Sequence, residues 1–229
     1  EALPALTRAH WVEATGKPVY EALGMSECST FISGAPDHPA PEGAMGWPQD
    51  GRHIAVLGAD LAPVPREAVG ELAVHRSDPG LFLGYWGADE ETAARFTPGG
   101  AWFRTGDMGT MTEPGAIRYE GRADDMMNAG GFRVAPGEVE AAMASCPGAG
   151  EVAAVEIRLS PEVTVIALAL TGPATPEALA AHAALHLARY KQPRLWRHMD
   201  ALPHNRNGKI DRRALRAAWP QPEDRTATQ

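Results

Sequence analysis

The character of the sequence changes near residue 125, and this change constrains the fold more than any other feature. Residues 1–122 are rich in Gly and Pro and carry short extended segments, whereas the residues that follow alternate between hairpin, helix and strand patterns. We therefore predict an α+β protein with a strand-rich part at 1–123, a compact part at 124–219 and a frayed tail at 220–229. In the compact part we expect a short sheet flanked by helices.

Few regular elements are predicted in the first part. Residues 52–57 and 70–75 are bounded by turn residues and are expected to form strands. Residues 88–96 are expected to form a short helix, because acidic residues at its start interact favourably with the helix dipole. This part as a whole is expected to be strand-rich, irregular structure.

Stronger periodicity in the second part predicts its elements. A hairpin is expected at 126–134 around Gly130 and Gly131, and residues 162–170 are apolar on both faces, as in a central strand that is covered on both sides. The remaining expected elements are a helix at 136–145, a strand at 151–159, a helix from Pro176 through Leu187, a strand at 195–199 and a short basic helix at 211–218.

The composition argues against several classes of protein. The net charge of −8, from 21 basic and 29 acidic residues, disfavours nucleic-acid binding, which needs clustered Lys and Arg. Cys28 and Cys146 have no CxxC partner, so we expect neither a disulfide framework nor a zinc site, and this usage fits a cytoplasmic location. The longest apolar run, 163–170, is too short to cross a membrane, and no signal peptide is visible. The chain begins without Met, so we expect a longer parent.

Residues 23–27, LGMSE, form the first of four segments that could carry chemistry. Gly24 permits a close backbone approach, the Ser26 hydroxyl suits a phosphate, and Glu27 offers oxygen to Mg²⁺. Read alone, the segment also fits a Gly-containing turn with a surface Glu, and its spacing favours that simpler interpretation.

The second segment is residues 102–109, WFRTGDMG. A Thr-Gly-Asp turn after an aromatic pair would present Asp107 at the tip of a loop, where its carboxylate could accept two hydrogen bonds from a ribose diol. The alternative is an Asx-turn in which Asp107 bonds its own backbone.

The third segment is residues 119–140, YEGRADDMMNAGGFRVAPGEVE. Arg122 and Arg133 bring fixed positive charges that suit phosphate or ribose oxygens. Asp124 and Asp125 lie at the change in composition, where a hinge between domains would fall. The glycines at 130–131 leave a surface without side chains along which a slender ligand could lie. The alternative is a plain hairpin with two solvated arginines.

The fourth segment is residues 203–212, PHNRNGKIDR. Lys209 stands on a polar loop, from which its charge could enter an active site in one conformation. The segment is not a P-loop, because the GxxxxGK[ST] spacing is absent. The alternative is an ordinary surface lysine in a turn.

In their order and spacing, the four segments resemble the adenylate-forming superfamily of acyl-CoA synthetases, peptide-synthetase adenylation domains and luciferases. The resemblance runs from about Tyr20 to Leu215 and includes residues 70–86, GELAVHRSDPGLFLGYW. It implies the C-terminal end of a large AMP-binding domain followed by a small mobile domain. It also implies a reaction in which a carboxylic acid and ATP form an acyl-adenylate and pyrophosphate, after which the small domain swings and a thiol takes the acyl group.

The resemblance assigns a role to each matching residue. Glu27 would ligate Mg²⁺, Asp124 would be the hinge, and Lys209 would stabilise charge in the adenylation step. Gly131 would line the pantetheine tunnel of CoA, beside Gly130. The implied nucleotide contacts are Gly24, Met25, Ser26, Asp107, Tyr119, Arg122 and Arg133.

Two departures from the family pattern matter. Leu23 stands where many members place an aromatic residue against adenine. The Ser/Thr/Gly-rich loop that binds the triphosphate lies upstream in the family, so we expect a missing N-terminal segment of the same enzyme. Most of the acyl pocket would lie there too, which leaves aromatic, alicyclic and short-to-medium fatty acids open as substrates. An oligomer is compatible with the sequence.

Three functions remain open. Residues 135–140, after the Asn-Ala-Gly-Gly-Phe-Arg turn, look closer to acyl-CoA synthetases and favour an acid:CoA ligase, whose partners are the acid, ATP and CoA. The alternative is an adenylation domain that transfers the acyl group to a carrier-protein thiol, and the lack of a carrier domain after the tail favours CoA. The isolated chain is expected to be inactive, because it carries half of an active site.

Overall fold

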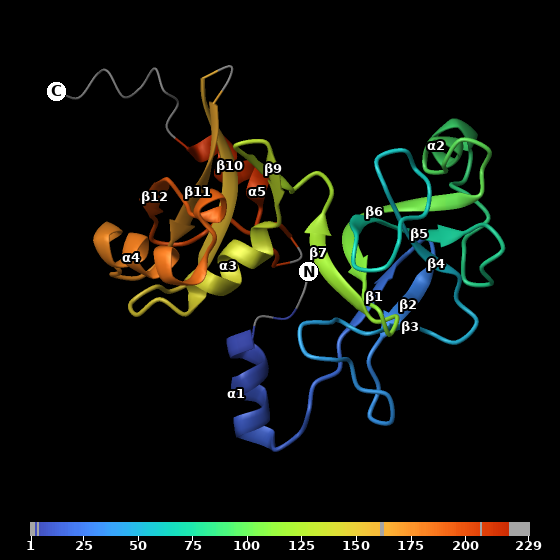
Figure 1. Cartoon of the computed structure of the whole chain (residues 1–229), viewed down its shortest axis with the longest axis horizontal. Helices are drawn as coiled ribbons and strands as arrows, with labels where there is room; N and C mark the ends of the chain where they lie inside the picture. Colours follow the sequence, from blue (N-terminus) through green and yellow to red (C-terminus); the bar gives the residue numbers. More distant parts are fainter. Residues whose placement is uncertain (1–2, 4, 161–162, 207, 220–229) are drawn as a thin grey trace. The chain divides into compact units, whose positions relative to one another are not determined.

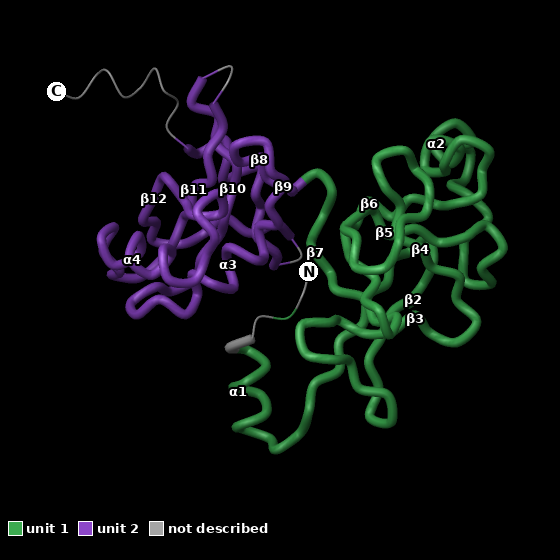
Figure 2. Tube along the Cα trace, viewed as in Figure 1, with its two compact units in different colours: residues 1–124 green, residues 125–229 purple. Residues whose placement is uncertain are grey.

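A computed structural model describes residue 3 and residues 5–160, 163–206 and 208–219. The chain divides into two compact units between Asp124 and Asp125 (Figure 2). The expected tail at 220–229 and the expected start of a strand at residue 162 lie outside the described residues. Over the described ranges, no helix is both long enough and apolar enough for a membrane crossing.

Unit 1, residues 1–124, contains two antiparallel sheets (Figure 1). The first sheet joins β1 (Ala22–Met25), β2 (Ser29–Ser33) and β3 (Trp47–Pro48). The second joins β4 (Ile54–Leu57), β5 (Val69–His75), β6 (Trp102–Met111) and β7 (Ile117–Arg122) in sequence order. The unit also contains helices α1 (Ala5–Thr15) and α2 (Asp89–Ala94).

One hydrophobic core holds the two sheets of unit 1 together. Phe31 and Ile32 from β2 and Leu72 and Phe103 from β5 and β6 are fully buried in the same cluster. Backbone pairing between Ile117 of β7 and the residues before β3 links the sheets at their edges. The strands that carry the predicted site residues of this unit are therefore fixed to one core.

The sequence-based placement of Asp107 at the tip of a loop is wrong. Asp107 lies inside the ten-residue strand β6 and pairs with Arg122 of β7. Its neighbour Gly106 has φ +77°, and the register between β5 and β6 shifts opposite this stretch. Because glycine tolerates this conformation, the Thr-Gly-Asp stretch forms an irregularity within a strand, and the strand continues through it.

Unit 2 has the predicted α+β architecture, with a short sheet flanked by helices. Its sheet has the order β10-β11-β12, in which β11 runs antiparallel to β10 and parallel to β12. The elements are β8 (Met127–Ala129), β9 (Phe132–Val134), α3 (Pro136–Ala144), β10 (Val152–Ser160), β11 (Val163–Leu170), α4 (Pro176–His186), the 3-10 helix η1 (Arg189–Lys191), β12 (Leu195–His198) and α5 (Arg212–Ala218).

Strand β11 is covered on both faces, as its apolar sequence predicts. Leu168 belongs to a core cluster that includes Met143 of α3 and Leu179 of α4. Ala167, on the opposite face, belongs to a second cluster that includes Leu215 of α5. All five side chains are at most 1% exposed. The sheet therefore lies between α3 and α4 on one side and α5 on the other.

Candidate functional site

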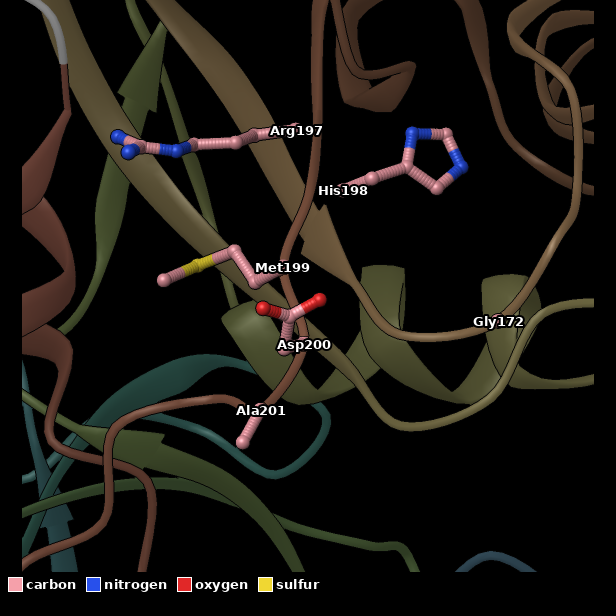
Figure 3. Close-up of a pocket in the computed structure, with 6 residues that line it drawn as sticks. All are labelled: Gly172, Arg197, His198, Met199, Asp200 and Ala201. Atoms are coloured by element: carbon pink, nitrogen blue, oxygen red, sulfur yellow. The ribbon is translucent and has the colours of Figure 1, made fainter.

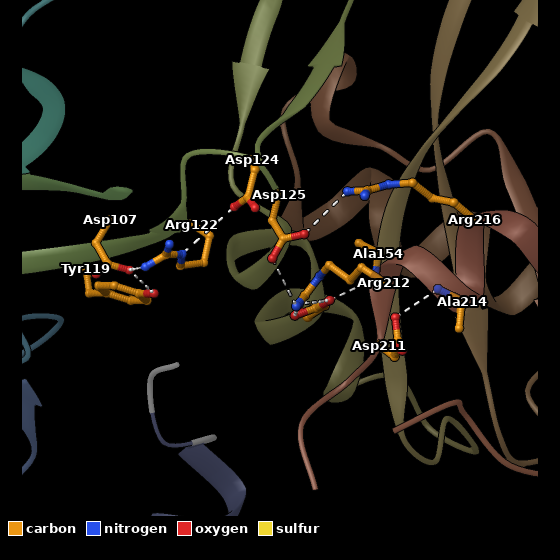
Figure 4. Close-up of polar contacts among 11 residues, drawn as sticks. Asp107, Tyr119, Arg122, Asp124, Asp125, Ala154, Asp211, Arg212, Ala214 and Arg216 are labelled. Carbon is orange, nitrogen blue, oxygen red and sulfur yellow. Dashed lines mark hydrogen bonds and ion pairs between the residues drawn. The ribbon is translucent and has the colours of Figure 1, made fainter. Parts of the chain in front are cut away.

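Asp107 is the centre of a hydrogen-bonded group on β6 and β7 (Figure 4). The Tyr119 hydroxyl donates to Asp107 Oδ1 at 3.0 Å, and Arg122 Nη1 donates to the same oxygen at 3.3 Å. The Asp107 side chain is 7% exposed. Among the described residues, both side-chain donors meet Oδ1, so Oδ2 is left to accept from a ligand.

Contacts from β5 hold the Thr-Gly-Asp stretch in place. Glu71 Oε1 accepts from the Gly106 N–H at 3.0 Å, and Glu71 Oε2 accepts from Arg104 Nε and Nη2 at 2.9 and 2.8 Å. Thr105 Oγ1 donates to a carbonyl of β5 at 2.7 Å and accepts from the Asp107 N–H at 3.0 Å. The backbone at Gly106 and Asp107 is thus positioned by the side chains of Glu71 and Thr105.

Arg122 lies over Gly106 and supplies a fixed charge beside Asp107. A Cβ added to Gly106 would lie 2.9 Å from Arg122 Nη2, an atom that can shift, so the φ of +77° is what favours glycine here. Burial lowers the pKa of Arg122, but Asp107 and Asp124 outweigh it and raise the pKa above its ordinary value. Asp124 lies 3.9 Å from Arg122 Nε, and its side chain is 83% exposed.

Ser26 and Glu27 lie in the turn between β1 and β2. Ser26 is exposed and Glu27 is half-buried. A Cβ at Gly24 would lie 2.9 Å from both the Ser29 carbonyl oxygen and Thr30 Cα, so the backbone that approaches Gly24 closely is that of β2. Gly24 therefore has a packing role that would hold the turn in place.

Tyr85 holds the Glu27 carboxylate. Its hydroxyl donates to Glu27 Oε1 at 2.7 Å, and the Phe82 N–H donates to the Glu27 carbonyl at 2.6 Å. Thr92 Oγ1 accepts from the Tyr85 N–H at 2.9 Å and fixes the other end of the segment. Burial and the hydrogen bond to Glu27 raise the pKa of Tyr85, so the hydroxyl stays protonated as a donor. Residues 82–85 thereby fix the orientation of Glu27.

Glu27 is suited to a Mg²⁺ site that a ligand completes. Mg²⁺ is usually bound through one or two carboxylates together with phosphate oxygens and water. Over the described part of the chain, no three His, Cys, Asp or Glu side chains gather where they could hold a metal.

One hydrophobic core supports both the 24–27 turn and the group around Asp107. Met25, next to the turn, and Tyr119, beside Asp107, both pack against this core.

The β8–β9 hairpin of unit 2 carries Gly130, Gly131 and Arg133. The glycines have φ +57° and +87°, and a Cβ added to either would meet nothing within 4 Å. Phe132 and Arg133 are exposed, whereas Val134 is buried. The predicted hairpin is confirmed, and its turn presents an open stretch of backbone.

Lys209 stands on a turn that Asn205 closes. The Asn205 N–H donates to the Lys209 carbonyl at 2.8 Å, and the Lys209 N–H donates to Asn205 Oδ1 at 3.1 Å. His204 and Ile210 pair as an isolated bridge on either side of the turn. The backbone of Lys209 is therefore fixed, while its side chain is exposed.

A second ionic group ties the start of unit 2 to α5 (Figure 4). Asp125 accepts from Arg216 Nη2 at 3.4 Å and lies 4.0 Å from Arg212 Nη1. Arg212 Nη2 in turn bonds both carboxylate oxygens of Glu140 at 2.7 and 2.8 Å. The first residue of unit 2 is therefore held by its own unit.

A pocket of about 680 Å³ lies at the end of β12 in unit 2 (Figure 3). Arg197 and His198 extend to opposite sides of the strand, and His198 Nε2 lies 2.7 Å from the Ala174 carbonyl oxygen. The side chains do not converge on a shared centre. The lining residues, none of them predicted for the site, are Gly172, Arg197, His198, Met199, Asp200 and Ala201.

The predicted residues thus fall into groups on both units. Asp107, Tyr119 and Arg122 meet in one group of unit 1, and the 24–27 turn is a second feature of that unit. Gly130, Gly131, Arg133 and Lys209 belong to unit 2. The sequence motifs assign no role to Glu71 or Tyr85. Both fall within residues 70–86, the stretch that shares the family resemblance, and this is the signal that could have found them.

Two family models match the chain: AMP-binding enzyme over residues 1–86 and AMP-binding enzyme C-terminal domain over residues 138–209. The chain is 35% identical over 210 residues to a long-chain-fatty-acid–CoA ligase of Escherichia coli O6:H1, covering 90% of this chain and 37% of that protein. It is 32% identical over 228 residues to a 3-hydroxybenzoate–CoA ligase of Aromatoleum sp. (strain CIB), covering 94% and 42%.

The fold is similar to that of ATP-bound MatB from Rhodopseudomonas palustris. The TM-score to MatB is 0.85 and the sequence identity is 29%. The TM-score to an ATP-bound RpMatB-BxBclM chimera is 0.84. The match to MatB covers 94% of this chain and 43% of that chain. The chain therefore spans well under half the length of the relatives it matches.

Proposed function

This chain belongs to the AMP-binding, adenylate-forming enzyme family, and from that premise we propose that it is the C-terminal part of an acid:CoA ligase. The parent enzyme would activate a carboxylic acid with ATP to an acyl-adenylate and transfer the acyl group to CoA. Unit 1 would be the end of the large AMP-binding domain. Unit 2 would be the small mobile domain, with the exposed Asp124 as the hinge.

The group around Asp107 is the observation that carries the proposal. A carboxylate with an oxygen left for a ligand suits the two hydroxyls of a ribose. Arg122 beside it offers guanidinium N–H groups to ribose or phosphate oxygens, and Tyr119 orients the carboxylate at 3.0 Å. Such a site would hold the nucleoside half of ATP while the phosphates react elsewhere.

The other predicted residues of unit 1 would act on the phosphates. Ser26 would donate to the α-phosphate from its exposed turn, and Gly24 and Met25 would bring the backbone of β1 close to the nucleotide. Glu27, held by Tyr85, would ligate Mg²⁺, which when bound neutralises charge on the phosphate oxygens. An in-line displacement at phosphorus requires residues that position charge in this way.

Unit 2 would supply the remaining parts of both half-reactions. Lys209 would stabilise the charge that develops during adenylation. Gly130 and Gly131 would let the pantetheine arm pass, because no side chain stands over their backbone. Arg133 would meet a phosphate of a nucleotide or of CoA.

The thiol that accepts the acyl group would come from outside this chain. Cys28 is fully buried, and burial raises the pKa of its thiol to about 12. Cys146 is 3% exposed. Neither cysteine offers the accessible thiolate that acyl transfer needs. CoA is the proposed acceptor, and a carrier-protein thiol is the alternative.

The proposed function is tested by acid-dependent ATP–pyrophosphate exchange in the full-length enzyme, followed by addition of CoA. The acids include long-chain fatty acids and hydroxybenzoates, because the matched relatives are named for them, together with alicyclic and shorter fatty acids. Exchange with one class of acid and formation of its CoA thioester are expected. No exchange with any acid would contradict the proposal, whereas acylation of a carrier protein but not of CoA would favour the alternative.

Changing Tyr85 to phenylalanine is expected to weaken Mg²⁺ binding. The change removes the hydroxyl that holds Glu27 Oε1, and a hydrogen bond to a charged group contributes enough for roughly a tenfold effect. The Mg²⁺ concentration for half-maximal pyrophosphate exchange should therefore rise about tenfold, and so should the concentration of Mn²⁺ that gives half-maximal binding by electron paramagnetic resonance.

The matched control is Tyr20→Phe, which removes an exposed hydroxyl of the same unit. It should leave the Mg²⁺ requirement and the melting temperature unchanged. If Tyr85→Phe lowers the melting temperature but leaves both metal measurements at their original values, Tyr85 has a structural role and does not position Glu27.

A further inference from the structure

His204 joins the turn that carries Lys209 to the central sheet of unit 2. His204 Nε2 lies 2.9 Å from Glu151 Oε1, a contact that spans 53 residues of sequence. On the other edge of the ring, Nδ1 lies 2.9 Å from the Leu202 carbonyl oxygen. The Leu202 side chain is buried in the same cluster as Leu215 of α5. The ring therefore bridges the base of the turn and a distant part of the chain.

Glu151 is a firm attachment point for the turn. It directly precedes β10, and Thr171 directly follows β11. The Glu151 N–H donates to Thr171 Oγ1 at 2.8 Å, and the Glu151 carbonyl accepts from the Thr171 N–H at 2.9 Å. Because β10 and β11 pair along their length, the contact with His204 connects an exposed turn to the rigid sheet.

Both ring nitrogens of His204 face oxygens that accept hydrogen bonds. A neutral imidazole carries one N–H, so both contacts are hydrogen bonds at the same time only when the ring holds two protons. The charged side chains at the start of α5 have other partners, since Asp211 caps that helix and Arg212 bonds Glu140. Position 204 therefore suits a cation that donates in two directions.

We propose that the contact between His204 and Glu151 anchors the Lys209 turn on unit 2, which makes His204 a positioning residue for adenylation. This inference rests on the proposed function, in which Lys209 stabilises charge in that step. The hydrogen bonds between Asn205 and Lys209 lie within the turn, so they fix its shape but not its place on the unit. A charge stabilises a transition state only where it is held in position.

The anchor is compatible with a small domain that swings between two half-reactions. His204 and Glu151 both belong to unit 2, so their contact does not depend on how the unit is turned. Thioester formation, which would not use Lys209, would not need the anchor. The two side chains are 36% and 46% exposed. Ion pairs with such exposure change equilibria by up to about fivefold, so the expected effect is far smaller than loss of the lysine itself.

In the full-length enzyme, His204→Gln should lower kcat of pyrophosphate exchange roughly three- to fivefold at unchanged KM for ATP, because the turn then holds Lys209 in place for a smaller fraction of the time. Thioester formation from synthetic acyl-adenylate should keep its rate. His204→Arg, which supplies a fixed charge and several donors, should restore the exchange rate. Arg118→Ala removes a similarly exposed ion pair with Glu67 in unit 1 and should change neither rate.

Cleavage of the native enzyme after Lys209 by a lysine-specific endoprotease reports on the turn without any turnover. This cleavage should be roughly three- to fivefold faster in His204→Gln and in Glu151→Ala, because cleavage follows the population of the released turn. The double variant should show no larger rise than the single ones, since both changes remove one contact.

Unchanged cleavage in His204→Gln would show that the contact does not hold the turn. Faster cleavage with the original exchange rate, or with equal losses in both half-reactions, would remove His204 from the positioning of Lys209. Failure of the proposed function gives a different result. Faster cleavage in both single variants of an enzyme that forms no acyl-adenylate with any acid would support the anchor and sink the proposed function.

Discussion

In the full-length enzyme, replacing Lys209 with alanine is expected to slow acyl-adenylate formation roughly 100- to 1,000-fold, the usual effect of removing one positioned charge from a transition state. Transfer of the acyl group from preformed acyl-adenylate to CoA should keep its rate, because the phosphorus chemistry is then complete. Pyrophosphate exchange measures the first half-reaction. Thioester formation from synthetic acyl-adenylate measures the second.

The Lys209→Ala substitution is expected to remove the charge without changing the local backbone. The turn around Lys209 is held by its backbone hydrogen bonds to Asn205, and the side chain itself is exposed, so alanine should leave the turn intact. Lys17→Ala, which removes an exposed lysine of unit 1, should leave both half-reactions unchanged. Equal losses in both half-reactions for Lys209→Ala would show that the lysine does not act in adenylation alone.

Replacing Asp107 with asparagine is expected to raise KM for ATP roughly 100-fold, because the variant keeps the shape of the side chain but loses the charge that pairs with Arg122 and would accept from a ribose. KM for ATP in the exchange reaction is the measurement, with the melting temperature recorded beside it. Asp107→Ala should also lower the melting temperature, since it leaves the Tyr119 hydroxyl and Arg122 without their shared acceptor.

Two further variants provide KM values for ATP with which the Asp107→Asn result can be compared. Tyr119→Phe removes one of the donors to Oδ1 and should raise KM for ATP about tenfold. Asp37→Asn changes an exposed carboxylate of the same unit and should have no effect. A stable Asp107→Asn variant with the original KM for ATP would remove Asp107 from the nucleotide site.

The fold of unit 2 could be predicted from sequence because its signals are local. Pro at the start of α3 and α4 marks both helix beginnings, and the apolar run of β11 marks a strand that is buried on both faces. Each observed boundary lies within one or two residues of the expected one. Neighbouring residues along the chain carried all of this information.

Unit 1 was harder to predict, because its regular structure depends on partners far away in sequence. Helix α1 has no charge pattern at its ends, and β1 to β3 are short and lack a clear alternation. Asp107 was expected at a loop tip, since Thr-Gly-Asp has the composition of a turn. Pairing with β5, where Glu71 bonds the Gly106 N–H across 35 residues, keeps that stretch in a strand.

The same distinction applies to the candidate site. Residues that would touch a ligand, such as Asp107 and Lys209, stand in motifs and could be named from the sequence. Residues that orient them could not, because their roles exist only after folding. The bond from Tyr85 to Glu27 spans 58 residues and leaves no local pattern.

The division between Asp124 and Asp125 has a consequence for how such proteins can diversify. The buried cluster of unit 1 draws all its members from residues before this peptide, and both clusters of unit 2 draw theirs from residues after it. A genetic crossover at this point would therefore cut through neither core, so each half would bring its full set of packing partners into a hybrid. The packing of each unit is therefore free to evolve without changes in the core of the other unit.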